Sequence, residues 1–185
     1  MCPFIMRVGR LALTAALATI LAILASPALL AQHDPAHHSP YVDHADREIK
    51  SLSDEEVTQL LGGEGMGLAL PAELNGYPGP KHVIELADEL ELSTEQRQAT
   101  QDIFDRLKSS AVELGKKIVH LEKELDAAFA NHSISPESLE SMTSEIGSLK
   151  GLLRATHLRA HLEQTDVLNP AQRHRYVELR GYGKS

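Results

Sequence analysis

Two runs of regularly spaced apolar residues between Leu92 and Val167 constrain the fold more than any other feature of the chain. In both runs the apolar or small residues recur three and four positions apart, a spacing that places them on one face of an α-helix. The link between the runs, Asn131–Pro136, is short. A short link makes antiparallel neighbours the default arrangement of two helices. The sequence therefore predicts a long helical hairpin that bends near Ser133.

The two runs also match each other in register. Both helices rise by the same amount per residue, so residues that face each other across an antiparallel pair lie equally far from the bend. The pair that would follow next in this register, Phe104 with Glu163, joins an apolar and a charged residue, so we expect the pairing to end there. The alternative is two amphipathic helices that pack on different partners. Seven pairs of apolar or small residues satisfy one register: Ala128 with Leu139, Leu125 with Met142, Leu121 with Ile146, Ile118 with Leu149, Leu114 with Leu153, Ala111 with Thr156, and Leu107 with Ala160.

Short helices flank the hairpin in this prediction. Ser53, followed three residues later by Glu56, has the form of a capping box and starts a helix over Ser53–Leu61, which Gly62 and the glycines after it end. Pro80 opens a further helix with one apolar face. Apolar residues at helical spacing dominate, and strand-like alternation is nearly absent. The predicted fold class is all-α, a long antiparallel helical hairpin with short flanking helices.

The first 31 residues have the pattern of a secretory signal peptide. Two arginines precede the apolar run Leu11–Ala25, and small residues continue to Ala31. We expect export with cleavage after Ala28 or Ala31. The alternative is an uncleaved membrane anchor, because the apolar segment extended to Ala31 could just span a bilayer. The only cysteine, Cys2, lies in this segment, so the exported chain has no thiol for catalysis, for a disulfide or for a metal.

The remaining chain divides into two parts in the prediction. Residues 32–79 are rich in His, Gly and Pro, and we expect a flexible N-terminal extension that contains one short helix. Residues 80–185 form the predicted helical domain.

The charge and the motif content exclude two classes of function. The net charge is −8, and an acidic protein is a poor nucleic-acid binder. Residues 150–185 are locally basic, with 7 basic and 3 acidic residues, and we expect them to face the acidic half of the chain or an acidic partner. The sequence contains no HExxH, no GxSxG and no glycine loop that leads from a strand to a helix. We therefore expect a protein that is not an enzyme.

One short pattern occurs twice: a leucine, a residue whose side-chain oxygen can cap a helix, and a glutamine three residues after the cap. The cap oxygen accepts a hydrogen bond from an unpaired N–H group at the helix start, and the glutamine reaches back to the N–H of the cap residue. Each copy is expected to start a helix, the first from Thr94 and the second over Pro170–Arg180. We interpret the motif residues first as structural and second as a client or partner site. The two copies are Leu92, Ser93 and Gln96, and Leu168, Asn169 and Gln172.

Two such motifs around a helical hairpin, behind a signal peptide, resemble the LTxxQ motif of the Spy/CpxP family of periplasmic proteins, whose metal-linked relatives include ZraP and CnrX. The resemblance covers roughly residues 80–185, and its second copy has Asn169 and Pro170 where Thr and a variable residue are usual. It implies a hooked four-helix protomer that pairs as an antiparallel, cradle-shaped homodimer. It also implies ATP-independent chaperone activity toward unfolded envelope proteins, or a role in envelope stress or metal signalling.

A second apolar face of the hairpin would carry this function. We expect it to bury exposed apolar segments of client proteins or to form the dimer contact. A purely structural partner of a membrane sensor protein is a further alternative. The residues off the main seam are Ile103, Val112, Leu152, Leu158 and Leu162.

Histidines near residue 40 suggest a different function, a periplasmic heavy-metal sensor or resistance accessory. Four of them, His33, His37, His38 and His44, fall within twelve residues. Imidazole suits Zn, Cu and Ni, although an extended tail has no fixed geometry and the metal would have to order it. The alternative is a tail with incidental affinity for metals.

A second pair of histidines, His157 and His161, lies four residues apart on one helical face, a spacing that a metal can bridge. The register places Ser110 and Arg106 opposite them, and neither is a good metal ligand. We therefore expect His157 and His161 to lie on a solvated face.

Overall fold

The computed structural model describes residues 39–183, and these residues contain helices and no strands. The described residues from Pro40 onward form one compact unit. Its elements are the 3-10 helix η1 (Val42–His44) and the α-helices α2 (Asp54–Gly62), α3 (Leu70–Glu73), α4 (Pro80–Glu85), α5 (Thr94–Ala130), α6 (Pro136–Val167) and α7 (Pro170–Leu179). The predicted signal segment lies outside the described residues. Among the residues described, no helix is both long enough and apolar enough to cross a membrane.

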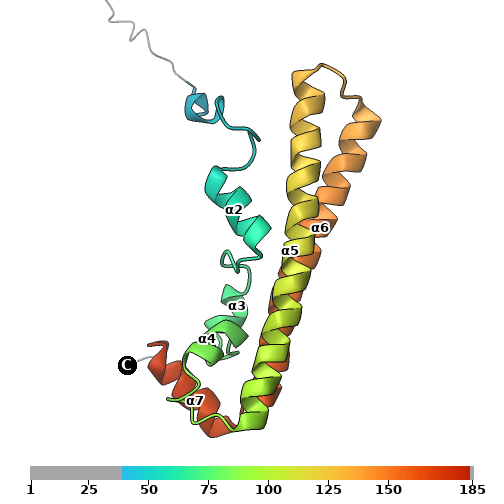
Figure 1. Ribbon diagram of the computed structural model, residues 1–185. Coiled ribbons are helices and arrows are strands. Elements are labelled where there is room, and N and C mark those ends of the chain that lie inside the picture. Colours follow the sequence, from blue (N-terminus) through green and yellow to red (C-terminus); the bar gives the residue numbers. More distant parts are fainter. Residues whose placement is uncertain (1–38, 184–185) are drawn as a thin grey trace, which may run out of the picture. The chain divides into compact units, whose positions relative to one another are not determined.

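Helices α5 and α6 pack antiparallel as a long hairpin, which confirms the predicted bend (Figure 1). Helix α6 begins with a capping box in which the Ser135 side chain accepts from the N–H of Ser138, and Pro136 occupies the first turn, where a missing N–H costs nothing. Along the hairpin, Arg106 pairs with Glu163 at 2.8 Å. This contact joins residues within about one helical turn of the predicted register.

The sequence analysis predicted that the pairing of the two long helices ends at Phe104, and this prediction is wrong. The contacts continue toward the open end of the hairpin, where Gln164 Nε2 donates to Thr100 Oγ1 at 3.1 Å and both residues are fully buried. Polar side chains therefore continue the interface beyond the last apolar pair through this hydrogen bond, although Gln164 Oε1 has no partner among the described residues. The spacing of apolar residues could not predict this part of the interface, because its paired side chains are polar.

The first core lies between α2, the residues before it, and the upper part of the hairpin. Buried Ile49, Leu52 and Leu60 pack against Ala111, Ile118 and Leu153. Gly115 allows α2 to approach closely, because a Cβ at this position would lie 2.0 Å from the carbonyl oxygen of Leu60. Residues 40–79, expected as a flexible extension, instead belong to the same compact unit as the hairpin.

The second core lies at the open end of the hairpin. Helix α4, predicted from Pro80, buries Val83, and the segment after it contributes Ala87 and Leu90. These side chains pack with Leu92 and Leu168, the leucines of the two motif copies, and with Tyr176 of α7. The second core thus joins both motif copies to the terminal helix.

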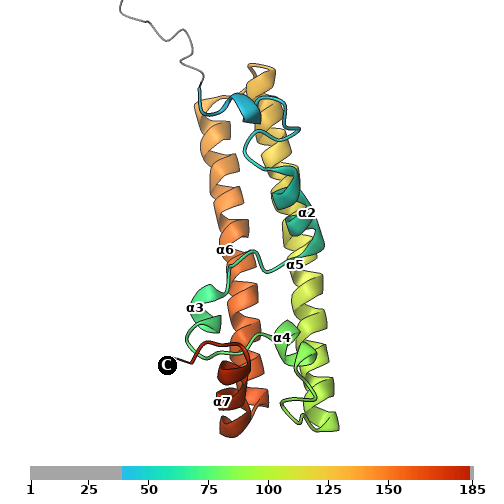
Figure 2. The same ribbon diagram turned by 90° about the vertical axis from the view of Figure 1, so that its left-hand side faces the viewer.

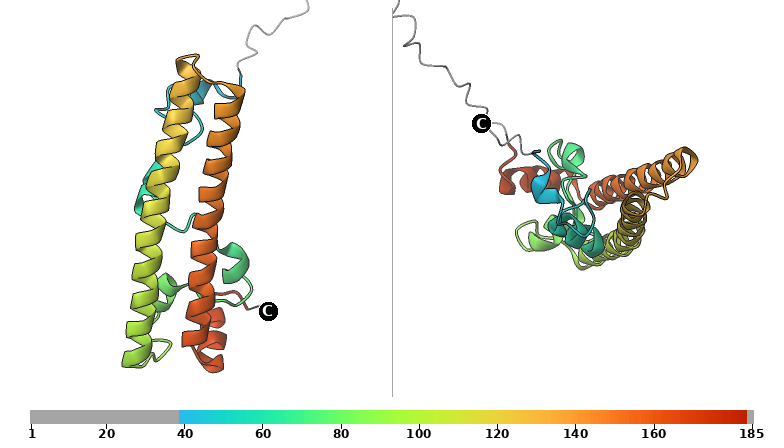
Figure 3. Two further views of the ribbon diagram at one scale, coloured as in Figure 1. Left: turned by 90° about the vertical axis from the view of Figure 1, so that its right-hand side faces the viewer. Right: turned by 90° about the horizontal axis from the view of Figure 1, so that it is seen from above.

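The flanking helices lie on one side of the hairpin. Figures 1 and 2 show α2, α3, α4 and α7 along that side, with α3 beside α6 and α2 beside α5. Figure 3 (left) shows the opposite side, where only α5 and α6 face the viewer. The two sides therefore differ: one is covered by the chain's own short helices, and the other consists of the two long helices.

Candidate functional site

The two motif copies start α5 and α7 through equivalent capping boxes, as predicted. Ser93 accepts a hydrogen bond from the N–H of Gln96, and its own N–H donates to Gln96 Oε1 at 3.1 Å. Asn169 Oδ1 accepts from the N–H of Gln172 at 2.9 Å, and the N–H of Asn169 donates to Gln172 Oε1 at 3.0 Å. The change from Ser to Asn at the cap therefore preserves the hydrogen-bond pattern.

The two glutamines also bond to each other, which the sequence analysis did not predict. Gln96 Nε2 donates to Gln172 Oε1 at 2.8 Å, and Gln172 Nε2 donates to Gln96 Oε1 at 3.0 Å. Each Nε2 also donates to a backbone carbonyl beside the other motif, Gln96 to Val167 and Gln172 to Leu90. Both carboxamides thus use their two donors and two acceptor sites. We call this arrangement, from Gln96 and Gln172, the glutamine clasp.

The residues around the glutamine clasp repeat the same symmetry. Leu92 and Leu168 are both buried. Each glutamine is followed by an arginine that donates to the carbonyl oxygen of the motif leucine, Arg97 to Leu92 and Arg173 to Leu168. Because both carboxamides are fully bonded within the chain, they have no free donor or acceptor for a partner, which supports the structural interpretation of the motif.

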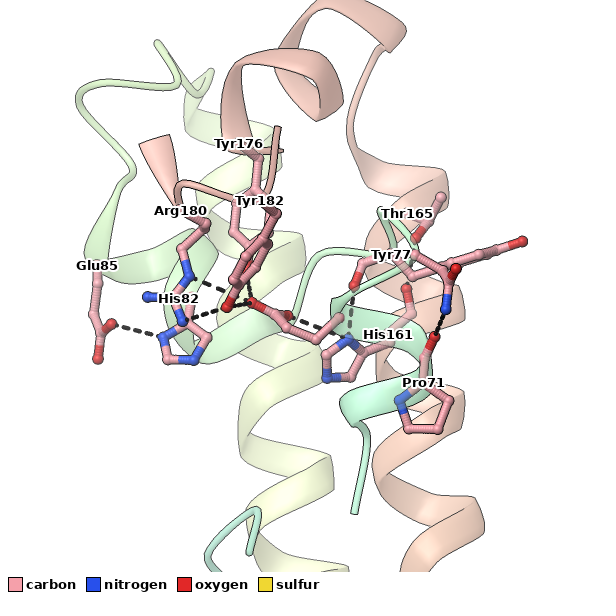
Figure 4. A network of polar contacts seen from close by, with 11 residues as sticks. Pro71, Tyr77, His82, Glu85, His161, Thr165, Tyr176, Arg180 and Tyr182 are labelled. Atoms are coloured by element: carbon pink, nitrogen blue, oxygen red, sulfur yellow. Dashed lines mark hydrogen bonds and ion pairs between the residues drawn. The ribbon is translucent and has the colours of Figure 1, made fainter. Parts of the chain in front are cut away.

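A second polar cluster centres on Glu73, at the end of α3. This carboxylate is only 7% exposed, and its Oε1 accepts hydrogen bonds from Tyr176 at 2.6 Å and from Tyr182 at 3.1 Å. Arg180 Nε lies 3.4 Å from the same oxygen. Figure 4 shows Tyr176, Arg180 and Tyr182, from α7 and the residues after it, converging on one point. Burial and the hydrogen bond to Glu73 raise the pKa of Tyr176, so its phenol stays protonated and donates.

His161 joins this cluster from α6. Its Nδ1 lies 2.8 Å from the carbonyl oxygen of Tyr77 and 3.7 Å from Glu73 Oε2 (Figure 4). A carbonyl oxygen can only accept, so Nδ1 carries a proton and Nε2 is the nitrogen that remains available. Glu73 Oε2 is buried and has no hydrogen-bond partner among the described residues.

The prediction that His157 and His161 lie on a solvated face is wrong. They are 5% and 9% exposed, because the loop after α2 and the start of α4 cover this part of α6. Burial and the neighbouring His161 lower the pKa of His157. The covering residues are more than seventy positions away in the sequence, so the helical pattern of α6 alone gave no signal of them.

Apolar side chains are exposed on α3 and on the neighbouring part of α6. Leu70 of α3 and Leu74, the residue after its end, are 52% and 57% exposed, and Leu162 of α6 is 54% exposed. The contact between Glu73 and His161 places α3 and this part of α6 at one level of the hairpin. Leu74 and Leu162 directly follow these two residues, so they lie at the same level. We call Leu70, Leu74, Leu158 and Leu162 the α3/α6 apolar surface.

The five residues predicted for the second face of the hairpin separate into two groups. Ile103 is buried and therefore not available to a client, and Val112 is half-buried beside Gly63 at the end of α2. Leu152 and Leu162 are exposed and Leu158 is half-buried. The prediction missed α3, which adds Leu70 and, directly after its end, Leu74, because a four-residue helix among glycines and prolines has no detectable period.

The predicted metal ligands fall mostly outside the described residues. His33, His37 and His38 lie there, while His44 ends the short helix η1 and is half-buried. Within residues 39–183, no group of three or more His, Cys, Asp or Glu side chains is placed to hold a metal ion.

Comparisons of the chain with protein-family models, with curated proteins and with solved structures find no match.

Proposed function

We propose that the chain is an exported, ATP-independent chaperone-like protein of the Spy/CpxP type. In this proposal it acts in the periplasm as a homodimer and binds unfolded envelope proteins or a membrane sensor protein. The glutamine clasp supports the resemblance, because the two motif copies form one symmetric unit at the open end of the hairpin.

The observation that carries the proposal is the α3/α6 apolar surface. Leu70, Leu74 and Leu162 are each more than half exposed, although Glu73 and His161, which directly precede Leu74 and Leu162, are buried. Exposed leucines carried on neighbouring helices are typical of a surface that binds other apolar groups. An unfolded client exposes such groups, and burying them removes apolar area from water at roughly 25 cal/mol per Å².

The surface is already formed in the folded chain, so binding requires no nucleotide-driven rearrangement. The glutamine clasp and the Glu73 cluster fix α3, α6 and α7 relative to one another. A rigid apolar surface loses little conformational entropy when it binds a client. Because the surface does not enclose the client, the client can also be released.

Aggregation of a denatured client, followed by light scattering without ATP, tests the proposal. We expect the purified chain to suppress aggregation and the double variant Leu74→Gln with Leu162→Gln to lose most of this effect. Phe129→Gln is the matched control, because Phe129 is 52% exposed but lies at the other end of the hairpin. Sedimentation of the same samples measures the oligomeric state. No suppression at excess protein, or equal loss in the control variant, contradicts the proposal.

A further inference from the structure

A cleft of about 170 Å³ lies beside the buried histidines of α6, and none of the four leucines of the α3/α6 apolar surface lines it. Four segments line it: the glycine loop after α2, the start of α4, the first half of α5, and α6. Its apolar wall includes Phe104 and Leu107 of α5 and Pro80 of α4. A cavity of about 150 Å³ accepts a molecule the size of benzene, so this cleft has room for one small organic ligand.

The polar lining of the cleft is mainly basic. Lys81 makes no hydrogen bond or ion pair with any of the residues described. Glu64 is the only carboxylate in the lining, and it already pairs with Lys108 at 2.8 Å. His82 bonds through Nδ1 to Glu85, outside the lining, at 3.0 Å. The Lys81 ammonium therefore lies at the edge of the cleft without a direct ion pair, although its charge contributes to the lowered pKa of Glu64 and of Glu85.

The two α6 histidines in the lining have nitrogens that the protein leaves without partners. His157 Nε2 is buried and has no hydrogen-bond partner in the described part of the chain. His161 Nδ1 is held by the carbonyl of Tyr77, which leaves Nε2, and this ring edge lies beside Gly79. A buried imidazole without a partner is costly, and a ligand that accepts a hydrogen bond would relieve this cost.

We propose that this cleft binds a small organic carboxylate. The apolar part of the ligand packs on Phe104 and Leu107, its carboxylate lies toward His157 and His161, and Lys81 supplies the charge at the edge.

Binding of an anion takes up a proton in this arrangement. The carboxylate favours the imidazolium form of His157, because its buried Nε2 has no other partner among the described residues and burial lowers the pKa of this imidazole while no anion is bound. The other charged or titratable groups that face the histidines are Glu64, Glu73, Lys81, His82 and Lys108. The ligand should therefore bind more tightly at about pH 6 than at about pH 8, whereas a metal ion competes with protons and shows the opposite dependence.

Calorimetric titration of the purified chain with sodium benzoate tests this proposal, with benzamide as the neutral analogue of the same shape. We expect saturable binding of benzoate that weakens by about tenfold between about pH 6 and about pH 8, and no saturable binding of benzamide. Equal binding of both compounds, no saturable binding of benzoate, or only Zn²⁺ binding that strengthens with pH would overturn the proposal.

Two lysine variants locate the site. Lys81→Met should weaken benzoate binding by about threefold, and its side chain is exposed, so the fold is retained. Lys116→Met is the matched control, because Lys116 is also exposed and lies on α5 outside the cleft lining. A second readout is the nitrogen chemical shifts of the histidines: benzoate should shift His157 and His161 and leave the exposed His120 unchanged. Equal effects of both lysine variants, or no histidine shift, would place benzoate elsewhere and overturn the assignment.

Discussion

The side-chain amides of Gln96 and Gln172 donate to each other's oxygens at 2.8 and 3.0 Å, although the residues are 76 positions apart. Each amide also caps the helix that its own motif starts. One side chain therefore has a local role, fixing a helix start, and a long-range role, holding that start against the other helix. The double occurrence of the motif is explained by this pairing, because one copy alone would leave its amide half-bonded.

The first prediction concerns this coupling. Gln96→Ala removes four hydrogen bonds of a half-buried amide and should lower the free energy of unfolding by about 2–4 kcal/mol. Gln172→Ala should have a similar effect. In the double variant the two effects should fall short of additivity by about 1–2 kcal/mol, because the amide–amide bonds can be lost only once. Urea denaturation measures all three variants.

The control for this cycle is Gln98→Ala. Gln98 lies in the first turns of α5 and bonds only to Asp102 on the surface. Its substitution should change the free energy of unfolding by less than about 0.5 kcal/mol. Full additivity of Gln96→Ala and Gln172→Ala would show that the two motifs act as independent caps.

The sequence was sufficient to predict the features that depend on neighbours along the chain. The capping boxes at Ser53, Ser93 and Asn169 are formed, because each depends on residues three positions apart. The hairpin is formed because its apolar period and its short link are also local signals.

The features that the sequence did not predict depend on segments distant along the chain. His157 was expected on a solvated face, but the glycine loop after α2 and the start of α4 cover it. The partner of Gln96 could not be identified from its own cap, and nothing in the local pattern indicated that Glu73 would accept hydrogen bonds from Tyr176 and Tyr182. In each case a polar residue is placed by tertiary packing, for which helical periodicity has no signal.

The second prediction concerns the pH dependence of stability. Burial holds the pKa of folded His157 below its ordinary value of 6.5. Below that value the unfolded chain binds more protons at this residue than the folded chain does, so stability falls as the pH is lowered. Above about pH 7.5 the residue is neutral in both states and contributes no pH dependence. Thermal unfolding between about pH 7.5 and about pH 5 should show a falling midpoint.

The variant His157→Leu isolates this effect. It removes the titrating group and keeps an apolar side chain in the covered position, so the fall in midpoint over this range should be smaller than in the parent chain. The control is His120→Gln, at an exposed position on α5, whose pH profile should follow that of the parent. The acidic groups with lowered pKa, such as Glu56 and Glu64, affect stability only at lower pH, because their ordinary value is 4.5. An unchanged profile in His157→Leu would contradict the assignment.

The third prediction compares two glycines in the interiors of the long helices. A Cβ at Gly115 would lie 2.0 Å from the carbonyl oxygen of Leu60, so Gly115→Ala must displace the end of α2 from α5. We expect this overpacking to lower the free energy of unfolding by about 1–3 kcal/mol. A Cβ at Gly147 would meet nothing within 4 Å, so Gly147→Ala should raise the free energy of unfolding by about 0.5–1 kcal/mol through helix propensity alone. Because the two substitutions are chemically identical and both occur within a helix, their opposite signs in urea denaturation would arise from the contact with α2. If Gly115→Ala is also stabilising, the packing of α2 against α5 is not the tight backbone contact described here.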